Sequence, residues 1–218
     1  MVKKLITLFK LGRKLAKSDA LVIVSKFINP PLSIKIVFKI LGFSFTKKEE
    51  VNVNEEEGKI LSDSLQTMGT TFIKLGQFLA TRPDIIGEKL SEHLETLQDK
   101  LPPFELSKAK DMIKNDLGNE NYNSIINLSD SVAAASIAQV HKAQINDNGT
   151  IKDVAIKILR PNIKKIFNEE IDALMLFAFF VESFIKKTRR LKLIEVVFLL
   201  KEITNLEMDL RFEAAAAN

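Results

Sequence analysis

Hydrophobic residues recur with a helical period over much of the chain. Between residues 61 and 79 they alternate in steps of four and three, so they form one apolar stripe and predict a single helix. A second stripe, between residues 86 and 101, stops at Pro102-Pro103. A third helix is expected over Ser107–Leu117, with Ser107 as its N-cap and Gly118 closing it. The first stripe consists of Leu61, Leu65, Met68, Phe72, Leu75 and Leu79.

The helical period fades between about Tyr122 and Leu159, where β-branched residues collect. Asn146-Asp147-Asn148-Gly149 is a strong hairpin turn, and we expect three short antiparallel strands around it. Helix is predicted again after Arg160-Pro161, to about Lys187, and from about Leu193 onward. This succession of elements predicts an α+β fold.

The N-terminal region carries most of the positive charge. Residues 1–48 hold 11 Lys or Arg and a single acid, Asp19, whereas residues 49–218 hold 21 bases and 27 acids. Residues 1–28 read as a basic amphipathic helix, and residues 32–45 as a second apolar and basic segment. Such segments can lie on an anionic membrane surface, or they can be ordinary surface helices that pack on a core. A nucleic acid partner is not expected, because Arg is scarce and no base-reading motif is present.

The amino-acid composition excludes several kinds of site. The chain has no Cys and two His, which excludes a disulfide scaffold and a thiolate metal site, so no metal ligands are assigned. The longest apolar run, residues 173–181, is about half of the ~20 residues that a bilayer span needs. We interpret it as a helix buried on several faces, and a cytoplasmic protein is expected.

Two short motifs suggest a phosphate site. Val154-Ala155-Ile156-Lys157 lies on the strand after the hairpin turn, where a kinase lysine reaches phosphates. About 20 residues earlier, Ala133, Ala134, Ala135 and Ser136 occupy the place of a kinase glycine-rich loop, although alanines restrict φ and stiffen the backbone. Taken singly, the lysine would be an exposed strand residue and the alanines a tightly packed hairpin.

Charged residues on two helices complete the candidate site. Lys74 and Gln77 lie one turn apart and outside the apolar stripe, so they could face a cleft or solvent. On the last helix, Asp209 and Glu213 share a face, while Glu207 lies about 120° away from Glu213. One carboxylate could pair with Lys157 and another with Lys74, or all could be solvated.

In combination these motifs resemble the UbiB/ADCK atypical kinase-like family, also called aarF-domain proteins. The resemblance covers about residues 60–218. Its four stretches are residues 71–84 (TFIKLGQFLATRPD), 133–143 (AAASIAQVHKA), 154–161 (VAIKILRP) and 206–218 (LEMDLRFEAAAAN).

The resemblance implies roles for individual residues. Lys74 and Gln77 would form the family's lysine-glutamine motif, on a helix that folds over the nucleotide site. Ala133 to Ser136 would be the alanine-rich nucleotide loop, Lys157 the phosphate-contacting lysine and Glu213 its partner on a helix like αC of kinases. Glu207 and Asp209 would be the acidic pair that contacts Lys74.

The resemblance also implies fold, domains and function. The fold would be a kinase-like N-lobe with an N-terminal helical extension, divided into a basic arm (1–48), the extension (56–118) and the lobe (119–218). The family uses ATP or ADP with magnesium and supports ubiquinone biosynthesis at membranes, and older descriptions name it 2-polyprenylphenol 6-hydroxylase. Its members are kinase-like, as transferases or ATPases, and the expected place is the cytoplasmic side of the inner membrane, as a peripheral protein.

One expectation concerns what the sequence does not contain. No Asp-Phe-Gly and no Asp-containing catalytic loop occur in these 218 residues, so no catalytic residue is assigned and the chain is expected to be inactive alone. It would then work with a separate C-terminal half or with proteins of ubiquinone synthesis. The alternative is a non-catalytic module, or pseudokinase fragment, that binds a membrane surface and a partner.

Overall fold

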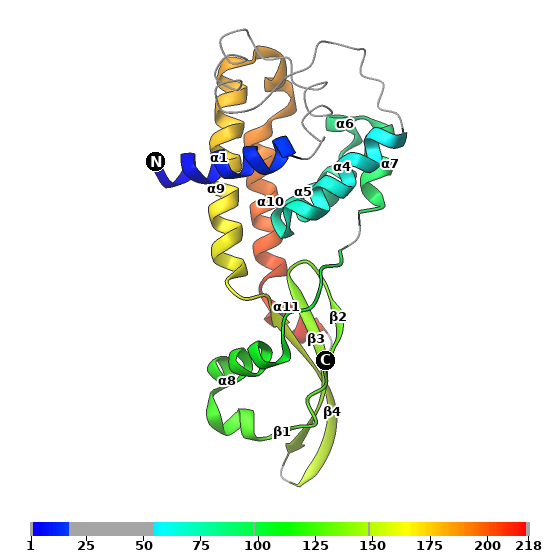
Figure 1. The fold of residues 1–218 in the computed structure, drawn as a ribbon, viewed down its shortest axis with the longest axis vertical. Coiled ribbons are helices and arrows are strands. Elements are labelled where there is room, and N and C mark those ends of the chain that lie inside the picture. Colours follow the sequence, from blue (N-terminus) through cyan, green and yellow to red (C-terminus); the bar gives the residue numbers. More distant parts are fainter. Residues whose placement is uncertain (1, 18–54, 98, 148, 217–218) are drawn as a thin grey trace. The chain divides into compact units, whose positions relative to one another are not determined.

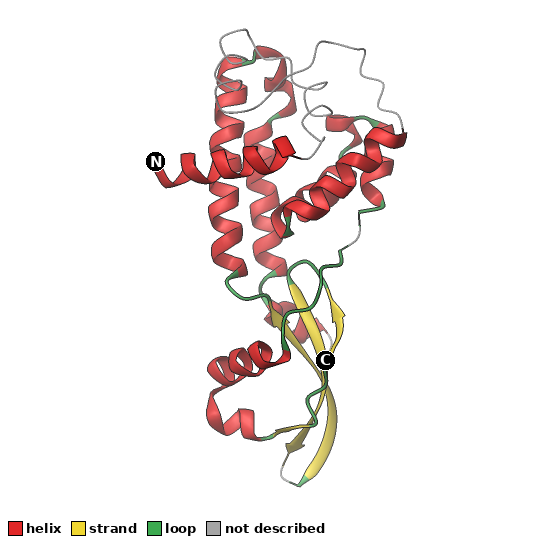
Figure 2. Cartoon of the chain, in the orientation of Figure 1, coloured by secondary structure: helices red, strands yellow, loops and turns green. Residues whose placement is uncertain are grey.

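The computed structural model describes residues 2–17, 55–97, 99–147 and 149–216. It combines helices with a small open antiparallel sheet, as expected for a kinase-like N-lobe with additional helices (Figure 1, Figure 2). The chain divides into two compact units. We call Met1–Gln98 with Lys164–Glu207 the helical unit, and Asp99–Ile163 with Met208–Asn218 the sheet unit.

The helical unit is discontinuous in sequence, because two late helices pack with the early ones. Its core holds the buried side chains of Phe72, Ile73, Leu94, Phe167 and Leu200. Within this unit α5 contacts α4, α7 and α10. The described elements of the helical unit are α1 (Val2–Lys17), α4 (Glu55–Met68), α5 (Thr70–Ala80), α6 (Pro83–Ile86), α7 (Glu88–Glu95), α9 (Ile163–Phe184), the 3₁₀-helix η1 (Lys186–Leu191) and α10 (Leu193–Glu207).

The prediction of one helix over residues 61–79 is wrong. Gly69 has φ of 104°, which a helix does not admit, so α4 ends at Met68 and α5 starts at Thr70. The break changes which residues face the core: Leu65 and Phe72 are buried as expected, whereas Leu75 and Leu79 are only half-buried. The second stripe is broken in the same way at Gly87, with φ of 85°.

Close helix packing explains two other glycines. A Cβ built on Gly76 of α5 would lie 3.0 Å from Leu65 Cδ1 and 3.4 Å from a Leu97 methyl carbon. A Cβ on Gly58 of α4 would overlap the His93 ring, closer than any real contact allows. The missing side chains therefore let α4, α5 and α7 approach one another.

The helix α1 is docked on the helical unit through its lysines. Lys3 and Lys4 form ion pairs with Glu169 and Asp172 of α9, at 2.7 and 3.1 Å. Lys14 Nζ donates a hydrogen bond to the Met68 carbonyl, at 2.9 Å. The opposite part of the helix leaves four apolar side chains exposed: Val2, Leu5, Ile6 and Phe9. The rest of the predicted basic arm, residues 18–48, lies outside the described residues.

The sheet unit is built on one long hairpin. Strands β3 (Ala138–Asp147) and β4 (Thr150–Leu159) pair over their whole length, and Gly149 turns between them with φ of 89°. On its other edge β3 pairs with two short strands, β1 (Ile125–Ile126) and β2 (Ser131–Ala134). The described chain thus has four strands where the sequence predicted three, because β1 is too short to have a hydrophobic period of its own.

The two faces of this sheet have different surroundings. The helix α8 (Leu106–Asn123) packs Ala109 and Ile113 against Ile158 on one face. The helix begins at Leu106 after Glu105, not after Ser107 as predicted, and Gly118 interrupts it with φ of 78°. Side chains alternate along a strand, so Lys157, next to Ile158, belongs to the opposite face.

No helix within the described ranges is long and apolar enough to cross a membrane. The apolar run 173–181 lies inside α9, where Ala173, Ala178 and Val181 are buried.

Candidate functional site

Lys157 of β4 and Glu213 form an ion pair in the sheet unit. Glu213 lies on α11 (Leu210–Ala216), and its two carboxylate oxygens are 2.8 and 2.5 Å from Lys157 Nζ. The Lys157 side chain is 33% exposed, so solvent reaches this pair. The structure therefore contains the lysine–carboxylate contact that the sequence suggested, while its role toward nucleotide stays a prediction.

The alanine-rich segment lies on the same face of the sheet as Lys157. In the ladder Lys157 is opposite Val140 of β3, and Val140 is opposite Ala133 of β2. Residues directly opposite one another project to the same side of a sheet. Because strands are spaced about 4.8 Å apart, Ala133 and Lys157 are roughly 10 Å apart across three strands. A phosphate chain could span that distance.

The predicted nucleotide loop is a tight connection between β2 and β3. Ala133 and Ala134 end β2, and the Ala135 N–H donates to the Ala138 carbonyl at 2.8 Å. The Ser136 N–H donates to Asp99 Oδ1, also at 2.8 Å. This backbone N–H is therefore already occupied by a carboxylate, which ties the loop to Asp99.

Arg160 fastens the same loop, and sequence reasoning missed it. Its guanidinium donates from Nε and Nη2 to the Ala135 carbonyl, at 2.9 and 2.8 Å, and to the carbonyls of Leu101 and Pro102, at 3.1 and 3.0 Å. Burial lowers the pKa of Arg160, and the negative charge of Asp99 opposes that shift. The only available signal was an arginine placed directly after the lysine strand.

A buried polar pair supports the covered face of the sheet. The Gln139 amide exchanges hydrogen bonds with the Phe104 backbone, at 2.8 and 3.1 Å, and its nitrogen is 2.9 Å from His141 Nε2. His141 Nδ1 is 2.9 Å from the Ser129 carbonyl. These partners fit a neutral imidazole protonated on Nδ1, because Nε2 faces a donor and Nδ1 faces an acceptor. The pair ties the segment before α8 to β3.

In the helical unit, Lys74 of α5 forms an ion pair with Glu207 of α10 at 2.7 Å. The Lys74 side chain is only 12% exposed, so this contact is better shielded from water than the Lys157 pair. Gln77 follows one turn later and is half-buried. The structure thus joins two of the predicted residues, since Glu207 was expected beside Lys74.

Asp209, the other predicted acid, lies in the sheet unit. Its carboxylate accepts hydrogen bonds from the Arg211 guanidinium at 2.7 and 2.5 Å and from the Arg211 N–H at 3.2 Å. Its predicted contact with Lys74 stays a prediction.

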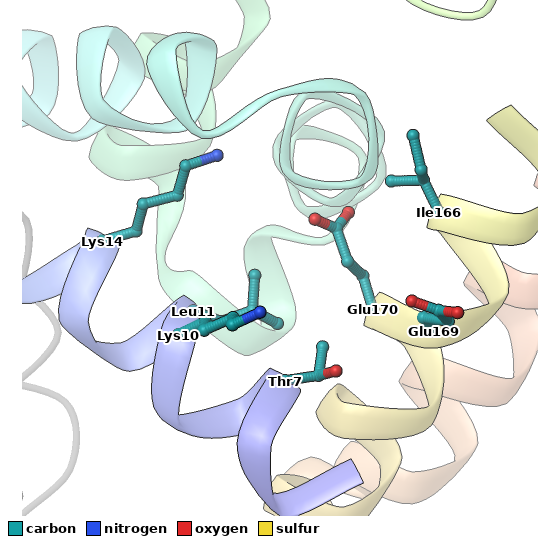
Figure 3. Close-up of a pocket in the computed structure, with 7 residues that line it drawn as sticks. All are labelled: Thr7, Lys10, Leu11, Lys14, Ile166, Glu169 and Glu170. Carbon is teal, nitrogen blue, oxygen red and sulfur yellow. The ribbon is translucent and has the colours of Figure 1, made fainter. Parts of the chain in front are cut away.

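A small cavity lies between α1 and α9 in the helical unit, and none of the predicted site residues lines it. Figure 3 shows Lys14 and Glu170 at this cavity, which has a volume of about 280 Å³. Burial raises the pKa of Glu170, whereas the Thr71 hydroxyl and the charge of Lys14 oppose that shift. The buried Thr71 Oγ1 forms no hydrogen bond within normal geometry, so it lies near the carboxyl without bonding to it. The cavity is lined by Thr7, Lys10, Leu11, Lys14, Ile166, Glu169 and Glu170.

Among residues 2–17, 55–97, 99–147 and 149–216, no group of three or more His, Asp or Glu could hold a metal ion.

Comparison with known proteins identifies a matching family and several relatives of this chain. Residues 96–218 match the ABC1 atypical kinase-like domain. The chain is 36% identical over 162 residues to a probable protein kinase UbiB of Aliivibrio fischeri strain MJ11, covering 73% of this chain and 29% of that protein. It is 33% identical over 189 residues to the probable protein kinase UbiB of Marinobacter nauticus, covering 86% and 33% respectively. The chain therefore spans about a third of the length of these curated relatives. It belongs to the ABC1 atypical kinase-like family.

Proposed function

We propose that this chain supplies the nucleotide-binding N-terminal part of a UbiB-type, ATP-dependent protein that supports ubiquinone biosynthesis. The observation that carries the proposal is the shared face of Lys157, Val140 and Ala133, with Glu213 paired to the lysine. The name of the relatives, probable protein kinase UbiB, supports the same reading.

Each part of this face has a task in nucleotide binding. Lys157 would neutralise phosphate charge, and Glu213 would hold its ammonium group in place. Ala133 to Ser136 would bound the phosphate side of the site, with Asp99 and Arg160 fixing the loop. Magnesium, when bound, would supply positive charge that neutralises the phosphates.

The first test is nucleotide-dependent stabilisation of the chain. A ligand at 100 times its Kd raises the free energy of unfolding by about 2.7 kcal/mol, so ATP should raise the melting temperature of the wild type. Lys157→Ala should lose most of that increase, because it removes a charge-assisted phosphate contact worth about 1.5–3 kcal/mol. Lys152→Ala is the matched control, since Lys152 lies on the same strand and pairs with Asp147 at 2.6 Å.

Two results would count against nucleotide binding at this face. One is a wild type whose melting temperature does not respond to ATP or ADP. The other is an equal loss of response in the Lys157 and Lys152 variants, which would place the nucleotide elsewhere or make its effect unspecific.

Catalysis is tested separately from binding. The chain alone is expected to show no ATPase activity, and activity should appear when it is mixed with the remaining C-terminal part of the Aliivibrio fischeri relative. ATPase activity of the chain alone would contradict the proposal that catalysis needs the C-terminal part. It would not contradict nucleotide binding at this face.

A non-catalytic membrane-peripheral module is the second candidate. The observation that favours it is α1, which leaves Val2, Leu5, Ile6 and Phe9 exposed, together with the basic Lys10 and Arg13. An amphipathic basic helix of this kind binds anionic lipid at the cytoplasmic side of a membrane. Binding to anionic vesicles without any nucleotide-dependent stabilisation would favour the module over the enzyme part.

A further inference from the structure

A second surface of the helical unit combines exposed aromatic rings with positive charge. It lies where α9 turns through η1 into α10, and we call residues 179–199 the hairpin tip. Five large apolar side chains of the tip are between 41% and 60% exposed. They are Phe179, Phe180 and Phe184 on α9 and Phe198 and Leu199 on α10.

The aromatic residues form a packed group on α9. The rings of Phe180 and Phe184, one turn apart, stack with centroids 6.2 Å apart, and Phe179 meets Phe180 edge-on at 6.1 Å. Exposed phenylalanines in contact with one another are unusual on a surface that faces only water. They need an apolar environment on their outer side.

The turn itself is strongly basic. Between residues 182 and 195 there are five Lys or Arg and two Glu, a net charge of +3. Both acids are engaged: Glu182 Oε1 accepts the Ile194 N–H at 3.0 Å, and Glu195 pairs with Lys192 at 3.0 Å. Lys186, Arg189 and Arg190 are exposed.

Hydrogen bonds hold the turn in place between the two helices. The Arg189 Nε donates to the Glu182 carbonyl at 3.0 Å, and the buried Thr188 hydroxyl donates to the Ile185 carbonyl at 2.7 Å. Together with the Glu182–Ile194 bond, these contacts join the end of α9 to the start of α10. The rings and the charges are thus held on one rigid tip.

From the geometry and charge of this tip we propose that it inserts into the headgroup region of an anionic lipid bilayer. Phe179 precedes the end of α9 by five residues, or about 7.5 Å at 1.5 Å per residue. Interfacial helices bury their apolar side about 5–10 Å into the headgroup and acyl boundary. With α9 lying along the surface in this way, its exposed rings enter that layer, while the exposed Lys186, Arg189 and Arg190 of η1 reach lipid phosphate groups.

Charge disfavours two other occupants. A second copy of the chain would bring the same +3 turn against itself. Residues 18–48 of this chain carry five lysines and one acid, so they share the sign of the tip. An anionic lipid surface has the complementary charge, and each basic side chain near it adds roughly fivefold to binding.

The absence of Trp from the chain gives a direct test. A Phe184→Trp variant of the full chain places one reporter at the tip, and Ile151→Trp places one at an exposed apolar position of β4 as the control. With vesicles of equal parts phosphatidylcholine and phosphatidylglycerol, the emission of the tip reporter should shift to shorter wavelength and be quenched by brominated acyl chains. The Ile151→Trp emission should not change.

Charge reversal tests the electrostatic part. Lys186→Glu with Arg190→Glu should weaken vesicle binding by roughly 25-fold or more, and added salt should weaken the wild type. Lys110→Glu with Lys114→Glu, two exposed positions of α8, changes the net charge equally and should have little effect.

Several outcomes would overturn the proposal. Sedimentation with vesicles but an unchanged tip reporter would mean that another segment, such as the N-terminal arm, makes the contact. A reporter already shifted without vesicles would mean that protein covers the tip. Equal binding to pure phosphatidylcholine would remove the role of the basic turn. None of these outcomes depends on nucleotide binding.

Discussion

Glu169 and Glu170 are consecutive residues of α9 whose carboxyl groups are perturbed in opposite directions. The hydrogen bond from Lys3 lowers the pKa of Glu169, whereas burial raises the pKa of Glu170. A raised pKa means that folding favours the protonated form, so this group costs stability as pH rises from about 4.5 through its folded value. A lowered pKa adds stability above about 4.5 that is lost on acidification.

The pair therefore predicts opposite effects of neutralisation. At pH 7, Glu170→Gln should raise the free energy of unfolding, and the gain should vanish below pH 4.5. Glu169→Gln should lower it slightly at pH 7, because its ion pair is exposed, and this difference should also vanish in acid. Denaturant unfolding at several pH values measures both, and a loss of stability for Glu170→Gln at neutral pH would contradict the assigned burial.

Arg160 gives a second prediction at this scale. Arg160→Lys keeps the charge but loses the planar fork that reaches three carbonyls, so the free energy of unfolding should fall by about 1–3 kcal/mol and ATP affinity should fall with it. Arg82→Lys, in an exposed pair with Asp84, is the control and should change stability by less than about 0.5 kcal/mol. Normal ATP affinity in a folded Arg160→Lys protein would show that the loop holds its form without this residue.

The candidate site was only partly visible in the sequence. The Lys157–Glu213 and Lys74–Glu207 contacts could be suggested, because family-like motifs mark those residues. Arg160 and Asp99 could not, because their task is to bond backbone groups of a loop, which leaves no periodic or compositional signal.

At the scale of elements, glycines with positive φ set helix ends that the apolar period alone does not predict. The period of residues 61–79 correctly indicates helix, but it carries no information on the positive φ of Gly69 that ends α4. The order of helices and the β3–β4 hairpin were predictable, since long periodic stretches and a strong turn mark them. The short β1 was not, because two residues have no period.

The approach of α4 to α7 makes a testable prediction. Gly58→Ala should destabilise the protein, because its Cβ would overlap the His93 ring. Adding His93→Ala removes the ring, so the double variant should be more stable than Gly58→Ala alone. Asp63→Ala, at an exposed position of α4, is the control for a substitution on the same helix. Additive losses in the double variant would mean that the two positions do not compete for space.

At the scale of the whole molecule, the helical unit is assembled from two separate parts of the chain. Residues 164–207 complete what residues 1–98 begin, an arrangement that a reading along the sequence could not give. The predicted boundaries at 48, 118 and 119 stay a prediction.

A pair of truncations tests this dependence. A chain ending at Ile163 lacks most of α9 and all of α10, so amides of α5 should exchange rapidly with deuterium. A chain ending at Glu207 keeps the unit complete and should protect them. Equal protection in both would show that α4 to α7 fold without the late helices.

The divided helical unit also has a consequence during synthesis. The ribosome must add 109 residues after Gln98 before Glu207 completes the unit, which takes about 5–20 seconds at roughly 5–20 residues per second. During this interval the apolar sides of α4, α5 and α7 are not yet covered by α9 and α10, while the hairpin of the sheet unit is being made. The yield of native protein in cells should therefore depend on chaperones that bind nascent chains, even where the finished protein is stable.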